Sequence, residues 1–354
     1  MAEYNVTRTL VLSAVTRAIR EIEEDPKRAM RRITDMGREF SKSRFQILVF
    51  DIIQELLSDD DSIYYAMAEN LLKTTDEASV KDFGVNLAYM SWTHGARILR
   101  RRQKELGVCL PWEITLFYDP EKEDGTSPEE IRKIIEEGTG LGIYSFHINQ
   151  RSAAASGTEI PALMADFPDC AFSWGLWKND LTRDHIQALK NCRGAMTLLN
   201  GGGEGLYECA SMLRSERLLF GVWTTYKTRE DLESLKNDLI PSISRGTGAP
   251  YLILVAQEGA DPSVMAEAAA FCRHARMVRP ASCFLVDYSG DSRTVSDLIC
   301  GHSHLLIIGP DRQILYPDPA RGKVFDIRAG LPALMKDIFP PCPADLSPEG
   351  MPGM

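Results

Sequence analysis

The sequence of 354 residues lacks any apolar run of about 18 residues, the length that a membrane-spanning helix requires. Its first residues, Met1 to Asn5, do not show the basic-then-apolar order of a secretory signal peptide. Its eight cysteines include no Cys-x2-Cys pair, the spacing typical of many zinc sites. We therefore expect a cytoplasmic protein with reduced thiols and without a membrane partner.

Basic residues are also in the minority, because 40 lysines and arginines stand against 50 acids and give a net charge of −10. This balance argues against a surface that binds nucleic acid or an acidic membrane. Local clusters such as Arg100-Arg101-Arg102 are expected to lie on exposed helix faces beside acids. The hydrophobic content of 44% is ordinary for a soluble globular protein and sufficient for a sizeable core.

Residues 1–108 are expected to form only helices. From Leu10 to Ile22, apolar residues recur at the spacing of one helix face. Asp25-Pro26 is typical of a helix start, and the acidic run from Ser58 to Ser62 is expected to cap a further helix rather than bind calcium. His94 stands without a second candidate ligand beside it, which favours a structural role.

From about residue 109, strand-like and helical segments alternate. Strands are expected at Trp112–Tyr118, Gly142–Asn149, Cys170–Leu176, Ala195–Asn200, Leu219–Tyr226, Tyr251–Gln257, Cys283–Tyr288, Leu305–Ile308 and Gln313–Tyr316. Helix starts such as Ser127-Pro128 lie between them. This alternation is typical of a parallel sheet.

We therefore predict an α/β fold with three parts. An all-helical N-terminal region (1–108) precedes a partial or full TIM-like (βα) barrel (109–330). A C-terminal helix and a Pro/Gly-rich tail (331–354) follow, and the tail is expected to be disordered from Pro340.

In such a barrel the carboxyl ends of the strands meet on one face, where ligands usually bind. The residues predicted to bind a ligand there are His147, Asn149, Arg151, Lys178, Gly201, Gly202, Gly203 and Glu258. The glycines belong to Gly201–Gly205, a strand-to-helix turn whose N–H groups could bind a phosphate or carboxylate. A plain tight turn explains the same glycines, because their spacing matches no nucleotide-binding motif.

Cys300, His302 and His304 offer soft metal ligands close together in the sequence. On a strand the two histidines would share one face, but no fourth ligand follows nearby. We therefore predict no metal site.

The order of several short motifs resembles the radical SAM superfamily over roughly residues 40–330. These motifs are a helical leader ending in Leu106–Trp112, a first strand running into Asp119-Pro120, Phe167-Pro168-Asp169-Cys170 before the third strand, Gly203–Glu208 opening a helix, Ile299-Cys300-Gly301, and Tyr316-Pro317. The resemblance implies a (βα) barrel, a [4Fe–4S] cluster and SAM as cofactors.

The motifs that would hold these cofactors are absent. The loop after the first strand passes from Asp119-Pro120 to Gly125 without the Cys-x3-Cys-x2-Cys motif whose thiolates ligate the cluster. The family's Gly-Gly-Glu-Pro is replaced by Asn149-Gln150-Arg151-Ser152, and its C-terminal Pro-Cys by Tyr316-Pro317. No cofactor is therefore expected, and no catalytic residue is carried over from the resemblance.

Three hypotheses follow. The first is a degenerate radical SAM-like protein without a cluster, which acts as a binding, regulatory or scaffolding partner of an active relative or a peptide substrate and is not itself an enzyme. The second is a cluster-independent enzyme or sensor that binds a small anionic ligand at the barrel mouth. There Arg151 and Lys178 would supply charge, and His147 or Glu258 would act as acid and base. The third is a homo-oligomeric structural protein.

Overall fold

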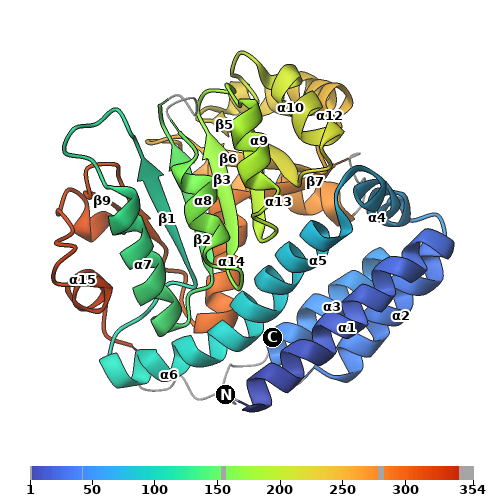
Figure 1. Cartoon of the computed structure of the whole chain (residues 1–354), viewed down its shortest axis with the longest axis horizontal. Helices are drawn as coiled ribbons and strands as arrows, with labels where there is room; N and C mark the ends of the chain where they lie inside the picture. Colours follow the sequence, from blue (N-terminus) through green and yellow to red (C-terminus); the bar gives the residue numbers. More distant parts are fainter. Residues whose placement is uncertain (1, 42, 153–156, 278–282, 343–354) are drawn as a thin grey trace.

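A computed structural model describes residues 2–41, 43–152, 157–277 and 283–342 (Figure 1). The predicted fold class is confirmed: a helical N-terminal region precedes a parallel βα sheet that curls through 216° into a half-barrel. Within the described residues, no helix is long and apolar enough to cross a membrane.

The N-terminal region consists of helices joined by short turns. They are α1 (Ala2–Glu24), α2 (Pro26–Glu39), α3 (Arg44–Leu56), α4 (Ile63–Thr74), α5 (Glu77–Val85), the π-helical segment η1 (Asn86–Gly95) and α6 (Ala96–Leu106). As predicted, Asp25 caps α2, and its side chain accepts a hydrogen bond from the Arg28 N–H. Ser62 occupies the N-cap of α4 but makes no side-chain cap bond, while Asp60 pairs with Arg31 instead.

All nine strands expected from the sequence are present in one sheet. They are β1 (Glu113–Tyr118), β2 (Ser145–Gln150), β3 (Ala171–Leu176), β4 (Ala195–Asn200), β5 (Phe220–Tyr226), β6 (Tyr251–Ala256), β7 (Phe284–Asp287), β8 (Leu306–Ile308) and β9 (Ile314–Tyr316). Their order is β7-β6-β5-β4-β3-β2-β1-β8-β9, and only β9 runs antiparallel to its neighbour. Because β7 and β9 are the two terminal strands and do not pair with each other, the barrel does not close, a point that the sequence left open.

Helices follow most strands and cover the outer face of the sheet. They are α7 (Pro128–Leu141), α8 (Glu159–Ala165), α9 (Arg183–Leu189), α10 (Leu206–Ser215), α11 (Arg229–Ser234), η3 (Leu235–Leu239), α12 (Ile240–Thr247), α13 (Pro262–Met277), α14 (Tyr288–Cys300), the short η4 (Asp318–Ala320) and α15 (Leu331–Ile338). The predicted capping box at Ser127 is formed, with Glu130 bonding back to the Ser127 N–H at 2.9 Å.

The helical region closes the amino-terminal end of the half-barrel, where α5, η1 and α6 run across the strands (Figure 1). The fully buried Asn86 amide donates to two carbonyls just before β3, those of Pro168 and Cys170. Gly95 meets the turn before β2 so closely that a Cβ atom added there would lie 2.4 Å from the Gly142 carbonyl oxygen. The concave face therefore opens at the other end, where the strands finish.

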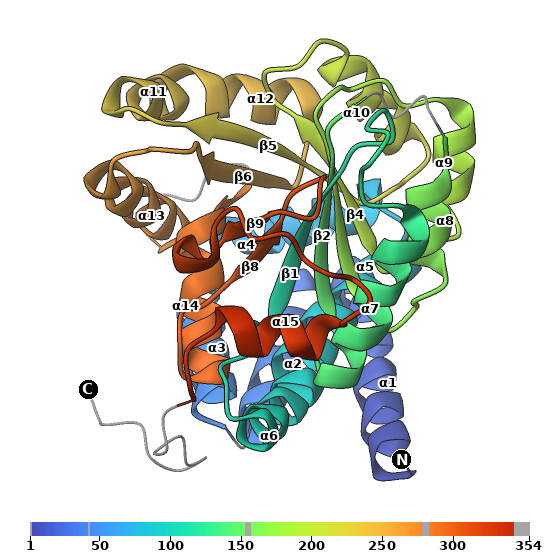
Figure 2. The same cartoon turned by 90° about the vertical axis from the view of Figure 1, so that its left-hand side faces the viewer.

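The C-terminal segment packs beside β1. Figure 2 shows α15, in red, next to α7 and α6. Beyond it, the Cys109 N–H donates to the Pro340 carbonyl and the Cys342 N–H to the Gly107 carbonyl. The prediction of disorder from Pro340 is therefore wrong for residues 340–342, because the backbone of this segment pairs with residues 107–109. The rest of the predicted tail, 343–354, lies outside the described residues.

Candidate functional site

The two faces of β1, β2 and β3 differ in chemistry because side chains alternate along a strand. The outward residues of β1, such as Ile114 and Leu116, join the apolar core with Ile131 of α7. The residues between them are polar. Thr115, His147 and Ser173 lie at one level of the sheet, since their Cα positions are paired in register across the three strands. This face lines the concave side of the half-barrel.

A buried carboxylate meets a histidine on this concave face. Glu113 of β1 is 2% exposed, and its Oε2 lies 2.7 Å from Nε2 of His147 on β2. When the carboxylate is ionised it only accepts, and Nε2 is then the donor of this hydrogen bond. The other oxygen, Oε1, is buried and has no hydrogen-bond partner among the described residues. A buried oxygen of this kind costs about 1–3 kcal/mol, so its retention calls for a functional explanation.

Two hydroxyl groups lie beside this pair. The hydroxyl of Tyr288, the first residue of α14, is hydrogen-bonded to that of Thr115 on β1. The Tyr288 ring meets the His147 ring edge-on, with centroids 5.3 Å apart. Burial raises the pKa of Tyr288 well above its ordinary value, and the negative charge of Glu113 raises it further. The Tyr288 phenol is therefore protonated at neutral pH and can serve as a donor.

This arrangement stands without a family assignment. No protein-family model matches the chain. No curated protein matches it either. The resemblance to radical SAM proteins therefore agrees with the fold, a helical region followed by a parallel half-barrel, and the family itself stays a prediction.

At the rim above this pair, Arg151 lies between two aromatic rings. Its guanidinium carbon is 4.7 Å from the Phe117 ring centroid and 5.5 Å from that of Trp177. Trp177 in turn packs on Trp223 of β5, with centroids 5.4 Å apart. No acid among the described residues pairs with Arg151. The rim therefore presents a cation held by aromatic faces and not neutralised by a carboxylate.

Asn149 lies one level above His147, on the same face of β2. Its register partner on β3 is Gly175, and a Cβ atom added to Gly175 would lie 2.3 Å from the Asn149 side-chain oxygen. The glycine thus makes room for the Asn149 amide on the concave face. His147 and Asn149 thus follow one another on the concave face of β2, and Arg151 comes directly after the end of this strand.

The glycine turn proposed as an anion cradle is already engaged within the chain. The Gly201 N–H donates to the Trp223 carbonyl, and the Gly202 N–H donates to the Asn200 side chain. The Gly203 N–H donates to the Asn200 backbone carbonyl. The turn packs so tightly on Asn179 that a Cβ atom at Gly203 would lie 2.9 Å from its amide nitrogen. The glycines serve this packing, which agrees with the tight-turn alternative.

The two remaining candidates stand apart from the concave face. Lys178 is exposed and follows Trp177 on the outer rim. Glu258 is exposed as well and forms an ion pair with Arg321, which follows η4. Neither residue contacts the Glu113–His147 pair in the described structure.

The β1–α7 turn, residues 119–127, is fastened to the β8–β9 hairpin. The Thr126 N–H donates to the Pro310 carbonyl at 2.8 Å, and Lys122 pairs with Asp311 at 3.1 Å. Arg312 reaches back to Glu130 at 2.8 Å, at the start of α7. This short turn is thereby held as part of the scaffold, and its sequence contains no cysteine.

Glu113, Thr115 and Tyr288 were not predicted as site residues from the sequence. Glu113 and Thr115 lie in the first half of β1, away from the carboxyl ends where a ligand was expected, whereas Tyr288 lies at the end of its predicted strand. One signal was present: an acid in an otherwise apolar and β-branched strand, Glu-Ile-Thr-Leu-Phe-Tyr, on the face opposite to Ile114 and Leu116.

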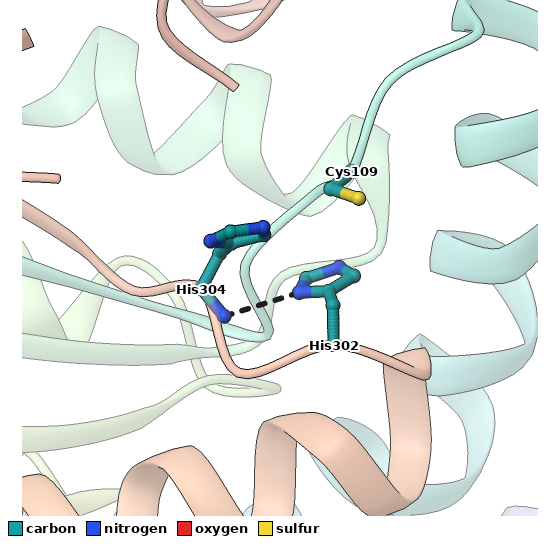
Figure 3. Close-up of side chains that lie close together, drawn as sticks. All are labelled: Cys109, His302 and His304. Atoms are coloured by element: carbon teal, nitrogen blue, oxygen red, sulfur yellow. Dashed lines mark hydrogen bonds between the residues drawn. The ribbon is translucent and has the colours of Figure 1, made fainter. Parts of the chain in front are cut away.

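A second cluster lies at the opposite, amino-terminal end of β1. Cys109, His302 and His304 each offer a ligand atom, and these atoms lie within 4.8 Å of one another (Figure 3). This buried group could hold a metal. The two histidines lie in the loop between α14 and β8, not on a strand as assumed from the sequence. Their neighbour in the group is Cys109 rather than Cys300, so the ligand set considered from sequence was incomplete.

Burial sets the ionisation of this second group. It raises the pKa of the Cys109 thiol to about 11, with a further contribution from the nearby Cys342. It lowers the pKa of His302 to about 4, assisted by His304, whose own pKa burial also lowers. Both imidazoles are therefore neutral at physiological pH, which is the form that binds metals.

Proposed function

We propose that the protein binds a small anionic ligand at the carboxyl-terminal end of its half-barrel and exchanges a proton with it through His147. The observation that carries this proposal is the Glu113–His147 pair, which is buried on the concave face with one carboxylate oxygen unpaired. Such pairs are a recurrent means of holding a histidine as a general base.

The orientation of His147 supports a proton-transfer role. In this arrangement Glu113 accepts a hydrogen bond from the Nε2–H group, so Nδ1 carries the lone pair of the neutral ring. No described residue is hydrogen-bonded to Nδ1. The carboxylate also stabilises the imidazolium that forms when Nδ1 takes a proton. No described serine or cysteine is bonded to His147, so we expect proton transfer to or from the ligand itself, or a water, rather than covalent catalysis.

Arg151 supports the anionic character of the ligand. A guanidinium fixed between Phe117 and Trp177 loses little conformational freedom on binding and presents its donors in a fixed plane. Trp223 lies beside Trp177 at the same rim and would contact a non-polar part of the ligand, whereas the deeper apolar residues of β4 to β6 are covered by Phe83 of α5.

A thermal-shift screen tests the binding step. The probes are inorganic phosphate, malonate, SAM, nucleotides and phosphorylated metabolites. We expect at least one anion to raise the melting temperature of the wild type and not of Arg151→Ala. Arg20→Ala is the matched control, since it removes the same charge from an exposed position on α1. An equal response of both variants contradicts the proposed site.

The proton-transfer step has its own test. Long-range ¹H–¹⁵N NMR reports which ring nitrogen of His147 carries the proton, and we expect Nε2 in the wild type. In Glu113→Leu, which removes the acceptor, the Nε2 preference should weaken. A wild-type spectrum with the proton on Nδ1 would remove His147 as the base.

A second candidate function is that of a scaffold derived from a radical SAM-like ancestor. The β1–α7 turn supports it, because the position that ligates the cluster in that family is here a short turn fastened by Lys122 and Arg312. The test is iron and sulfide analysis after anaerobic reconstitution. We expect no stoichiometric cluster, and about four irons per chain would overturn this candidate.

A further inference from the structure

We propose that Cys109, His302, His304 and Cys342 form a structural zinc site that fastens the C-terminal segment to the amino-terminal end of β1. The site lies at the end of the half-barrel opposite the proposed ligand and is independent of it.

Three of the ligands already lie together. Their ligand atoms are within 4.8 Å of one another, and Cys109 and His302 are 2% and 8% exposed. Figure 3 shows the Cys109 side chain, on the segment leading into β1, beside the two imidazole rings from the α14–β8 loop. The ring centroids of His302 and His304 are 5.0 Å apart. Side chains from two distant segments thus converge on one buried point.

Cys342 supplies the fourth ligand. Residues 107–109 and 340–342 pair as antiparallel strands, with a bridge between Val108 and Pro341. Since side chains alternate, Cys109 and Cys342 lie on the same face of this ladder, opposite to Val108. Cys342 lies close enough to Cys109 to contribute to the raised pKa of its thiol. The last described residue therefore brings a second sulfur beside Cys109. Its ligand atom lies outside the group that already falls within 4.8 Å, so metal binding would draw Cys342 onto the other three ligands.

Two sulfurs and two imidazoles are a ligand set that selects zinc among the common divalent ions. Calcium and magnesium require oxygen ligands, and none of the four side chains offers one. On binding, Cys109 and Cys342 each release a thiol proton to solvent, while the histidines bind in their neutral form. Four protein ligands fill a tetrahedral site, so the metal would be structural, without an open position for a substrate.

The ring of His302 is held from outside the cluster. Its Nε2 donates to the Gln103 side-chain oxygen at 2.7 Å, and its Nδ1 accepts from the His304 N–H at 3.2 Å. Gln103 is itself buried and fixed by the Leu110 N–H. Metal binding exchanges one of these two bonds for a ligand bond, and the other keeps the ring oriented, as is usual around zinc.

Metal analysis of the full chain tests this proposal. The protein is produced with added zinc and dialysed, and zinc is measured by mass spectrometry. We expect about one zinc per chain in the wild type and a loss of most of it in Cys109→Ser and in His304→Ala. Cys192→Ser is the matched control, because Cys192 is also buried and does not belong to the group of possible metal ligands. It should keep its zinc.

Cobalt substitution of the wild type identifies the type of ligand without relying on a variant. Wild type loaded with Co²⁺ should show the visible bands of a tetrahedral ion and a sulfur-to-cobalt charge-transfer band. That band should weaken in Cys342→Ser and not in Cys192→Ser. A wild type that retains no zinc, or binds cobalt without thiolate bands, overturns the proposal. An unchanged band in a folded Cys342→Ser overturns the fourth ligand.

Discussion

Replacing His147 by phenylalanine should leave the Glu113 carboxylate buried without any hydrogen-bond partner. In the wild type its Oε2 has His147 as partner, and its Oε1 already has none among the described residues. The substitution keeps an aromatic ring beside Tyr288, so the main loss is the bond to the carboxylate. Because Glu113 is only 2% exposed, water cannot replace this bond without a change in structure.

The expected magnitudes follow from that burial. Removing one partner of a buried charged pair costs about 3–5 kcal/mol of unfolding free energy. Glu113→Leu removes the charge and leaves only a neutral imidazole N–H unpaired, at a cost of about 1–3 kcal/mol. The double variant Glu113→Leu/His147→Phe removes both polar groups and should lie within about 1 kcal/mol of the wild type. The coupling between the two positions is then at least about 3 kcal/mol.

Urea denaturation at neutral pH, followed by circular dichroism, gives the free energy of unfolding of the wild type, the two single variants and the double variant. The exposed Arg17–Glu21 pair, at 2.8 Å on α1, serves as the matched control and should show a far smaller coupling. Additive effects at Glu113 and His147 would refute the reasoning, since they would mean that the carboxylate is solvated. If the double variant were as unstable as His147→Phe, the cost would arise from packing and not from the unpaired charge.

Three further predictions concern the scaffold, each measured by urea denaturation. Gly95→Ala should destabilise the protein by about 1–3 kcal/mol, because its Cβ would lie 2.4 Å from a backbone oxygen. Gly84→Ala, whose Cβ would have no atom within 4 Å, should stabilise helix α5 by about 0.5–1 kcal/mol. Equal effects of the two substitutions would contradict the close contact at Gly95. Burial raises the pKa of Asp287, which accepts the Tyr226 hydroxyl, so its stabilising contribution is complete at low pH and is lost as pH rises through the raised pKa. Asp287→Asn should therefore gain stability relative to the wild type between pH 3 and 7, and a difference independent of pH would count against this. Asn86→Ala should cost about 2–3 kcal/mol, since two buried carbonyls before β3 lose their donor, and a loss below about 0.5 kcal/mol would show that water replaces it.

The local structure could be read from the sequence because it depends on short-range physics. Strand β4 was predicted at its observed bounds, Ala195–Asn200, since β-branched and apolar residues bounded by polar turns leave little choice. The caps at Asp25 and Ser127 follow from the same local chemistry of side-chain oxygens and N–H groups. The strand ends likewise indicated that His147 and Arg151 share one rim.

What the sequence could not supply is the contact between distant segments. Alternation assigns Glu113 to a face, but only the register of β1 against β2 brings it to His147, 34 residues away. The 216° curl of the open half-barrel depends on how strands twist and pack together, which no single segment encodes. Cys109 lies beside His302 only because the segment that precedes β1 and the α14–β8 loop meet in space. The sequence by itself determined the elements and their faces. The tertiary structure alone decided which polar groups meet, because such contacts depend on every element packed between them.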